Sequence, residues 1–191
     1  MADEKTGADE PLSEAAQKEL LGIARRVIEA AAKGEPTPDC RSEHPELQAP
    51  VGAFVTLNEG EHLRGCIGRF VSDEPLWKVV VQMARASATE DPRFPPLAER
   101  ELPRVTIEIS VLSRMKRTRD PLSLELGVHG IYIRSGWRSG TFLPQVATEH
   151  HMSKEEFLSS CCAHKAGLPP DAWKDPGTEV YLYTAQVFGE G

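Results

Sequence analysis

Hydrophobic positions recur every three or four residues from residue 12 to residue 33. This spacing places the apolar side chains on one side of a helix, and Ser13 and Gly34 are suited to begin and end it. Residues 104–112 instead alternate between apolar and polar side chains. Strict alternation predicts a strand with one packed and one polar face, and it places Glu108 on the polar face, toward solvent or a cleft.

The other apolar runs predict a hairpin followed by a mixed second half. Residues 51–57 and 62–70 are expected to be paired strands joined by a turn at 58–61. The elements expected further along are a turn plus a strand at 127–135, a turn at 136–140, a short strand at 141–143, helices at 145–151 and 153–166, a loop at 167–177 and a closing strand at 179–188. No segment repeats, so residues 12–191 are expected to form one domain behind an acidic, disordered tail at 1–11.

A second amphipathic helix is predicted at 73–89, where the apolar positions again follow helical spacing. Ser72 or Asp73 is expected to cap it, with Pro75 near the first turn, where the missing N–H costs little. The helix carries only small side chains at 86–88, which permit another backbone to approach closely. We expect this part of the helix to pack against strand 62–70.

The sequence of strand 62–70, HLRGCIGRF, is unusual because Gly65 and Gly68 flank a cysteine. A glycine inside a strand weakens it and usually marks a bulge or a close approach of a ligand or another backbone. Arg64 stands two residues before Cys66, so in a regular strand the two side chains would share one face. This combination indicates a shaped site rather than an ordinary core strand.

Composition limits the classes of function. Lys and Arg number 22 against 29 Asp and Glu, which gives a net charge of −7 and a pI near 5.4. Such a charge disfavours non-specific nucleic-acid binding, and the basic cluster at 114–119 is expected to be a solvated loop. The N-terminus has no pattern of a secretory signal, and no apolar run is long enough for a membrane span. We therefore expect a cytoplasmic protein with four reduced cysteines.

Cys66 is the leading candidate for chemistry. A thiol becomes a nucleophile when a neighbouring cation or backbone N–H groups stabilise its thiolate, and Arg64 and the flanking glycines could supply both. A free cysteine is also among the most buried residue types, so a packing role is the alternative. The sequence places no base beside the thiol, because His62 lies about 13 Å away along a strand. His129 or His151 could arrive only through the fold.

Asp91 and Arg93 stand close together in the loop that follows the second helix. They either carry function or tie the loop to neighbouring backbone. Two further groups have the side chains of metal ligands, Cys40-Glu43-His44 and Cys161-Cys162-His164. Neither has the second half that a tight ligand cluster shows, so both are expected to be structural and no metal site is predicted.

Six residues of the glycine-rich strand, LRGCIG at 63–68, match the signature of the AMMECR domain family, whose prokaryotic members are called AmmeMemoRadiSam system protein A. Further matches are ASATEDPRFPPLAERELPRVTIEISVL at 86–112, GTFLPQVATEH at 140–150 and KAGLPPDAWKDPGTEVYLYTAQVF at 165–188. The chain is therefore identified as a member of this family. The resemblance implies a two-part α+β fold, with a largely antiparallel sheet flanked by helices and a cleft between a larger and a smaller part.

The resemblance also places the site at that cleft. The matching positions expected to act in catalysis are Cys66 and Arg64. The matching positions expected to bind are Gly65, Gly68, Asp91, Arg93, Gln145 and Glu149. Memo-like proteins and radical S-adenosylmethionine enzymes are associated with the family, so they are the implied partners. The resemblance names neither a substrate nor a cofactor.

Three functional hypotheses follow. The first is an enzyme or accessory catalyst that acts on a small anionic molecule, with Cys66 as nucleophile or acid/base and Arg64 and Arg93 holding the anion. The second is a non-catalytic binding or scaffold module for the implied partners, in which LRGCIG serves the structure. The third is a nucleic-acid-associated regulator, which the acidic net charge does not support.

Overall fold

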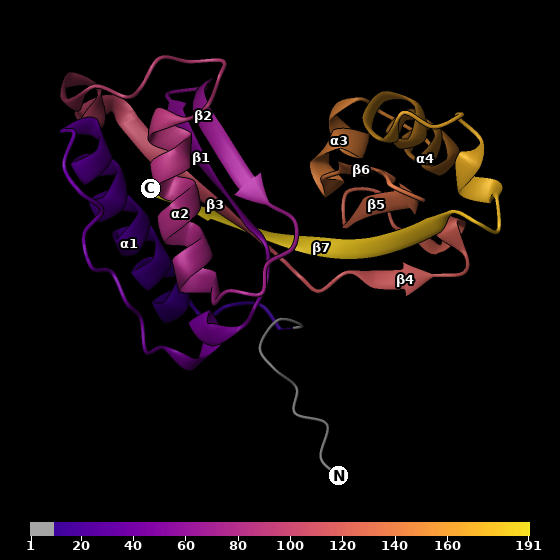
Figure 1. Ribbon diagram of the computed structural model, residues 1–191, viewed down its shortest axis with the longest axis horizontal. Coiled ribbons are helices and arrows are strands. Elements are labelled where there is room, and N and C mark those ends of the chain that lie inside the picture. The colour runs from indigo at the N-terminus through magenta and orange to yellow at the C-terminus, as the bar shows by residue number, and fades with distance from the viewer. Residues whose placement is uncertain (1–9) are drawn as a thin grey trace, which may run out of the picture. The chain divides into compact units, whose positions relative to one another are not determined.

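The computed structural model describes residues 10–191, which divide into two compact units (Figure 1). Unit 1 comprises the described residues up to Leu112 together with Gln186–Gly191, and unit 2 is Ser113–Ala185. Both contain helices and antiparallel strands, which confirms the predicted two-part α+β fold. The tail expected at 1–11 lies mostly outside the described residues. Among residues 10–191, every helix is too short or too polar to cross a membrane.

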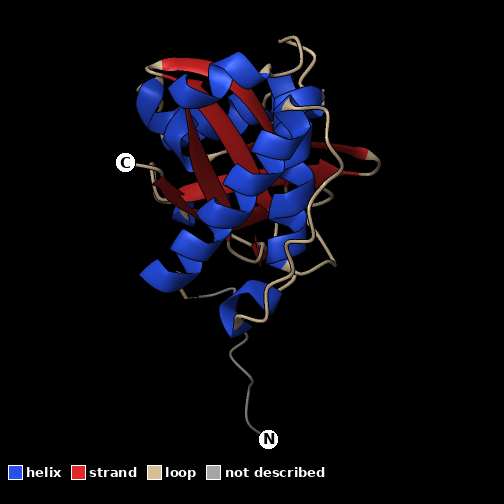
Figure 2. Ribbon diagram, turned by 90° about the vertical axis from the view of Figure 1, so that its left-hand side faces the viewer, coloured by secondary structure: helices blue, strands red, loops and turns tan. Residues whose placement is uncertain are grey.

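Unit 1 is a sheet with two helices packed against it (Figure 2). Its helices are α1 (Glu14–Ala32) and α2 (Leu76–Thr89), and its strands are β1 (Ala53–Glu59), β2 (His62–Arg69) and β3 (Val105–Leu112). β1 pairs antiparallel with β2 on one side and with β3 on the other. The last residues of β7 (Glu179–Gly189) follow β3, so β2 is the edge strand. Short 3-10 helices lie at Pro45–Gln48 and Glu99–Arg104.

The core of unit 1 forms where the predicted apolar patterns meet. The buried face of α1 packs on β3, and that of α2 packs on β1 and β2. The same core contains the alternating residues of β3, Val105, Ile107, Ile109 and Val111. Ser13 caps α1 by accepting a hydrogen bond from the Ala16 N–H at 3.3 Å. Gly34 ends the helix in a left-handed conformation, with φ of 72°. These features confirm the prediction for 12–33 and the packed face of 104–112.

The start of α2 differs from the prediction. The helix begins at Leu76, with Pro75 at its N-cap and no side-chain cap. The Ser72 hydroxyl instead accepts from the Glu74 N–H at 3.0 Å and so closes a turn before the helix. The expected cap at Ser72 or Asp73 is therefore wrong. A residue that precedes proline is disfavoured in the helical region, so Glu74 resists an earlier start.

Unit 2 is a second antiparallel sheet covered by short helices. Its elements are β4 (Lys116–Thr118), β5 (His129–Ser135), β6 (Arg138–Phe142), α3 (Pro144–Glu149), α4 (Lys154–Cys161) and the first part of β7, with 3-10 helices at Pro121–Ser123 and Ala172–Lys174. The strand order is β4-β7-β5-β6. Its separate core is built around Phe157, Ile131, Ile133 and Leu124. The turn and strand predicted at 127–135 and the strand predicted at 179–188 are confirmed.

Three expectations in unit 2 need correction. The basic cluster at 114–119 is not only a loop, because Lys116–Thr118 pairs with β7 as a strand. β6 already begins at Arg138, since the turn expected at 136–140 needs only Gly136 and Trp137. The helix expected at 153–166 keeps its predicted Ser153–Glu156 capping box but becomes a π-helical turn at Cys162–Ala166.

Candidate functional site

The register of β2 shows which side chains accompany the signature cysteine. Thr56 of β1 is paired with Cys66 of β2 and with Glu108 of β3, so the three residues form one row across the sheet. Their neighbours Val55 and Leu57 are fully buried against the helices. Because side chains alternate along a strand, the row lies on the sheet face that is turned away from the helices. All three side chains are partly exposed.

A β-bulge separates Arg64 from this row. Leu57 pairs with Gly65 and Asn58 pairs with Leu63, which leaves Arg64 as the extra residue of β2. The expectation that Arg64 shares a face with Cys66 assumed a regular strand, and the strand is not regular here. A glycine inside this strand was expected to mark a bulge or a close approach, and the bulge lies directly before Gly65.

The guanidinium of Arg64 is occupied by partners within the chain. Its Nε donates to Glu101 Oε1 at 2.8 Å, and its Nη2 donates to Glu101 Oε2 at 3.2 Å and to the Pro95 carbonyl at 3.0 Å. The residue is only 9% exposed. The hydrogen bonds from Arg64 and from the Ala98 N–H outweigh desolvation and lower the pKa of Glu101 to about 2. Arg64 therefore fastens the 95–101 segment to the edge strand.

Both signature glycines lie where no larger residue fits. A Cβ on Gly65 would stand 2.3 Å from the Ser87 carbonyl oxygen of α2. A Cβ on Gly68 would stand 2.2 Å from the ring of Phe54 on the neighbouring strand. The Gly65 distance confirms that the small residues near the end of α2 permit close packing against the signature strand. Gly65 serves this approach of helix and strand, whereas Gly68 makes room for the Phe54 ring.

Ser87 links the helix to the hairpin, and the sequence alone did not single it out. Its hydroxyl accepts from the Ile67 N–H at 3.0 Å and donates to the Val55 carbonyl at 2.7 Å. The side chain is 2% exposed. A lone serine between Ala86 and Ala88 was the available signal, because a buried hydroxyl in a small-residue run needs a partner.

Asp91 and Arg93 clasp the peptide of Cys66 at the free edge of the sheet. Asp91 is 4% exposed, and its Oδ2 accepts from the Cys66 N–H at 2.9 Å. Arg93 donates to both Asp91 oxygens and, through Nη2, to the Cys66 carbonyl at 3.3 Å. The two side chains thus satisfy backbone groups that face away from β1. The hydrogen bonds from Arg93 hold the pKa of Asp91 far below its usual range.

The Cys66 thiol lies next to a hydroxyl and near a cation. Thr56 Oγ1 donates to the sulfur at 3.3 Å. The pKa of Arg93 is raised, chiefly by its hydrogen bonds to Asp91, against desolvation, and further by the charges of Asp91 and of a Cys66 thiolate. The guanidinium is about half exposed, so it can also reach a ligand.

Cys66 differs from the other cysteines in its exposure. All four are free thiols, but Cys40, Cys161 and Cys162 are buried, whereas Cys66 is partly accessible. Burial raises the pKa of Cys161 to about 12. Among residues 10–191 no group of three or more His, Cys, Asp or Glu side chains could hold a metal ion.

Gln145 and Glu149 belong to α3 in unit 2, and both are exposed. The structure therefore brings together Arg64, Gly65, Cys66 and Gly68 with the Asp91–Arg93 loop, all within unit 1. The two α3 residues belong to the other unit. Their part in a shared site, and the cleft that the resemblance implies, stay predictions.

The geometry defines an α+β protein with a glycine-rich edge strand whose cysteine is clasped by an Asp-Pro-Arg loop. A family model, AMMECR1, matches residues 21–188, and the chain belongs to the AMMECR1 family. This confirms the recognition made from the sequence motifs.

Relatives of known sequence and structure are similar over almost the whole chain. A protein of Methanothermobacter thermautotrophicus is 40% identical over 187 residues, covering 94% of this chain and 97% of that protein. Protein NEQ441 of Nanoarchaeum equitans is 42% identical over 180 residues, covering 90% and 98%. The crystal structure of the uncharacterized protein PH0010 from Pyrococcus horikoshii has a TM-score of 0.82 at 37% identity, covering 94% of this chain and 93% of that one. The two proteins share one fold.

Proposed function

We propose that the chain is a cytoplasmic, thiol-dependent enzyme or accessory catalyst that acts on a small anionic molecule at Cys66. The observation that carries the proposal is the contrast among the cysteines. Three are buried, and the partly accessible one lies on the open face of the sheet beside the Thr56 hydroxyl and near Arg93. A cation near a partly exposed thiol is the environment in which cysteines become nucleophiles.

Each nearby residue has a definite role in this proposal. Cys66 is the nucleophile or acid/base, and Arg93 attracts the anionic group of the bound molecule. Arg64 is a positioning residue, because Glu101 and Pro95 occupy its guanidinium. Asp91 holds both the Cys66 peptide and the Arg93 side chain. The partners would be the Memo-like and radical S-adenosylmethionine proteins that the resemblance implies.

The rate of alkylation by iodoacetamide tests the proposal, measured by mass spectrometry from about pH 6 to about pH 9. We expect Cys66 to react in the folded protein at neutral pH faster than an unstructured cysteine peptide, whose thiol has a pKa of about 8.5. Cys40, Cys161 and Cys162 serve as internal comparisons and should react only on unfolding. Labelling of Cys66 only on unfolding would refute the proposal.

Arg93 variants separate an activated thiol from one that is merely accessible. Arg93→Ala should slow the alkylation of Cys66 at neutral pH several-fold, because the nearby positive charge is lost. Arg93→Lys should keep most of the rate. Arg69→Ala is the matched control, since this exposed arginine at the end of β2 pairs with Glu74 instead. Equal alkylation rates in wild type and the three variants would show that the charge of Arg93 does not activate Cys66.

The scaffold alternative is favoured by a specific observation as well. Arg64, Gly65, Gly68 and Asp91 all make close contacts within unit 1, so most of the signature serves the structure. Co-purification from the native host distinguishes the two functions. A scaffold would retain its Memo-like and radical S-adenosylmethionine partners after Cys66→Ser, while a wild-type chain that retains neither partner would contradict the scaffold.

A further inference from the structure

Unit 2 contains a cavity that is separate from the signature strand. It has a volume of about 740 Å³ and lies among β4, the start of β7 and the segment around the 3-10 helix Ala172–Lys174. None of the residues expected from the sequence to form the site lines it. Cavities of this size commonly hold small organic ligands.

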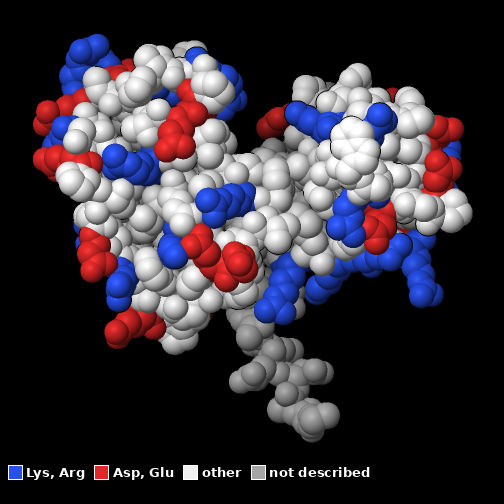
Figure 3. Space-filling model, viewed as in Figure 1, with Lys and Arg blue, Asp and Glu red and all other residues white. Residues whose placement is uncertain are grey.

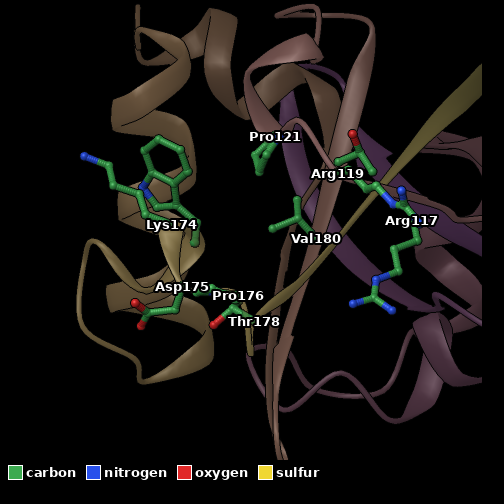
Figure 4. Close-up of a pocket in the computed structure, with 10 residues that line it drawn as sticks. Arg117, Arg119, Pro121, Lys174, Asp175, Pro176, Thr178 and Val180 are labelled. Atoms are coloured by element: carbon green, nitrogen blue, oxygen red, sulfur yellow. The ribbon is translucent and has the colours of Figure 1, made fainter.

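The middle of the cavity is apolar. Figure 4 shows Val180 between Pro121 and Pro176. Trp173 also lines the cavity. Val180 and Trp173 are almost fully buried, so their exposed atoms form part of a packed wall. The indole N–H of Trp173 donates to Ser159 Oγ at 3.0 Å, which fixes the ring in place. This lining suits a ring or a short hydrocarbon chain.

Positive charge flanks the apolar middle from two sides. In Figure 4, Arg117 and Arg119 stand on one side and Lys174 on the other. The Asp175 carboxylate is the one acidic group of the lining, and it points away from Val180 (Figure 4). The net charge of the lining is thus positive in a chain of net charge −7. Figure 3 shows Lys and Arg side chains gathered over the part of unit 2 that contains β4.

The three cations are not equally available. Arg117 is paired with Glu179 at 3.2 Å, and Lys174 lies over the Trp173 ring at 4.9 Å. Arg119 is exposed and has no hydrogen-bond or ion-pair partner within residues 10–191. A cation at the rim of an apolar cavity gains most from an anionic group that the cavity itself positions. Arg119 is therefore the group that would recognise the charge.

We propose that this cavity binds a small organic anion that combines an apolar ring or chain with one carboxylate or phosphate group. The apolar body lies against Val180 and Trp173, and the acidic group meets Arg119 at the rim. This site is independent of Cys66, so it adds a second ligand to the proposed function rather than restating its substrate.

The test uses 1-naphthyl phosphate as the probe and the whole chain in ¹H–¹⁵N correlation spectra. We expect saturable shifts of the Trp173 indole N–H and of the Thr178 and Val180 amides. Two matched probes divide the ligand into its parts, since 1-naphthol keeps the ring without charge and inorganic phosphate keeps the charge without the ring. Each should bind at least about tenfold more weakly, because each loses one of the two kinds of contact.

Charge variants complete the test. Arg119→Glu should weaken binding of 1-naphthyl phosphate about five- to tenfold, as expected for reversal of an exposed charge, and Arg119→Lys should stay within about twofold. Arg26→Glu, on the exposed side of α1 in unit 1, is the control and should leave the affinity unchanged.

Three results would overturn the proposal. They are shifts that do not saturate, equal affinity for 1-naphthol, and equal affinity of wild type and Arg119→Glu. Within the part of the chain that the structure describes, the Arg119 side chain has no hydrogen-bond or ion-pair partner, so its variants should keep the wild-type spectrum. Lys174→Glu provides a second charge reversal at the other side of the cavity.

Discussion

Arg64, Asp91 and Arg93 are the charged residues around the signature cysteine, and all three bond groups of their own chain. Arg64 bonds the Glu101 carboxylate and the Pro95 carbonyl, while Asp91 accepts from the Cys66 N–H. A β-strand at the edge of a sheet presents unpaired N–H and C=O groups. Here a loop supplies charged side chains in place of a further strand, and these hold the backbone of Cys66, whose thiol is partly exposed.

Replacing Arg64 by alanine should lower the free energy of unfolding by about 2–3 kcal/mol, because Glu101 is left largely buried without its partner. The two side chains are 11% and 16% exposed. Arg104→Ala is the matched control, since its ion pair with Glu59 is 60% and 39% exposed and should contribute less than about 1 kcal/mol. Urea denaturation measures both values. Equal losses would show that the Arg64 pair is as weak as a surface pair.

The same ion pair predicts a dependence on pH. The pKa of Glu101 is lowered to about 2 in the folded chain, below its ordinary value in the unfolded chain. A depressed carboxyl pKa stabilises the fold above the unfolded pKa, and this contribution disappears as the pH falls toward the folded pKa. The difference in unfolding free energy between wild type and Arg64→Ala should therefore be constant from about pH 7 to about pH 5 and shrink below about pH 4. A difference that grows in acid would contradict this origin.

Gly65→Ala should destabilise the protein by about 2–3 kcal/mol, because the new methyl group meets the Ser87 carbonyl at 2.3 Å and backbone must move. Gly68→Ala should cost less, since the atoms it meets belong to the Phe54 side chain. Gly22→Ala is the control, because this glycine inside α1 has open space around it. Alanine there should stabilise by about 0.5–1 kcal/mol. Thermal unfolding of the three variants gives the order.

Residue-level reasoning from sequence succeeded where one residue type has one physical meaning. A glycine within a strand implies close approach, and Gly65 and Gly68 both make one. It failed where the partner is distant along the chain. Glu101 lies 37 residues from Arg64, and the local sequence around either residue does not predict their ion pair. The bulge that redirects Arg64 is a property of the pairing of two strands, so it could not be predicted from the sequence of one strand either.

At the level of elements, the prediction worked for long periodic segments. α1, α2 and β3 bury enough side chains to carry a clear pattern, and all three were found. β4 was missed because it has three residues, two of them basic, and no apolar alternation. Its pairing with β7 decides its conformation. The start of α2 was misplaced because Ser72 and Asp73 look like caps, while Pro75 restricts the residue before it.

Ser87→Ala tests the link between α2 and the signature hairpin. The variant leaves the Ile67 N–H and the Val55 carbonyl without their hydroxyl partner, which should cost about 2 kcal/mol. Hydrogen exchange of the Ile67 amide should accelerate more than that of other β2 amides. Thr89→Ala is the control, since its hydroxyl only bonds back to the Arg85 carbonyl in the same helix. Unchanged exchange at Ile67 would mean that the hydroxyl does not hold the strand.

On the scale of the whole molecule, the chain has two apolar cores with different members. One surrounds α1 and α2, and the other surrounds Phe157 in unit 2. Length and the lack of repeats predicted one domain, and the family resemblance implied a two-part α+β fold. The boundary after Leu112 and the return of residues 186–191 to unit 1 were not readable from the sequence. The division depends on which helices pack on which sheet. The strands of both sheets have similar apolar patterns in the sequence, so these patterns do not show to which sheet a strand belongs.

Because the two cores have different members, we expect a substitution in one core to destabilise mainly its own unit. Phe157→Ala removes a fully buried ring that stacks on Phe142, and it should destabilise unit 2 by about 3–5 kcal/mol. Leu20→Ala should act in the same way on unit 1. Native-state hydrogen exchange measures the effect separately for each unit. Loss of protection spread evenly over both units in each variant would show that they unfold together.

The division of β7 between the units has a consequence for synthesis. Residues up to Ala185 complete the sheet of unit 2 between β4 and β5, and the residues from Gln186 onward lie beside β3 in unit 1. On the ribosome, every other strand emerges before this one. Until residue 179 and those after it have left the exit tunnel, β3, β4 and β5 each present an unpaired edge in the nascent chain. Such edges are prone to pair with the wrong strand. Neither sheet of this protein can therefore be completed before β7 has been synthesised. Chaperones would bind the nascent chain during that interval.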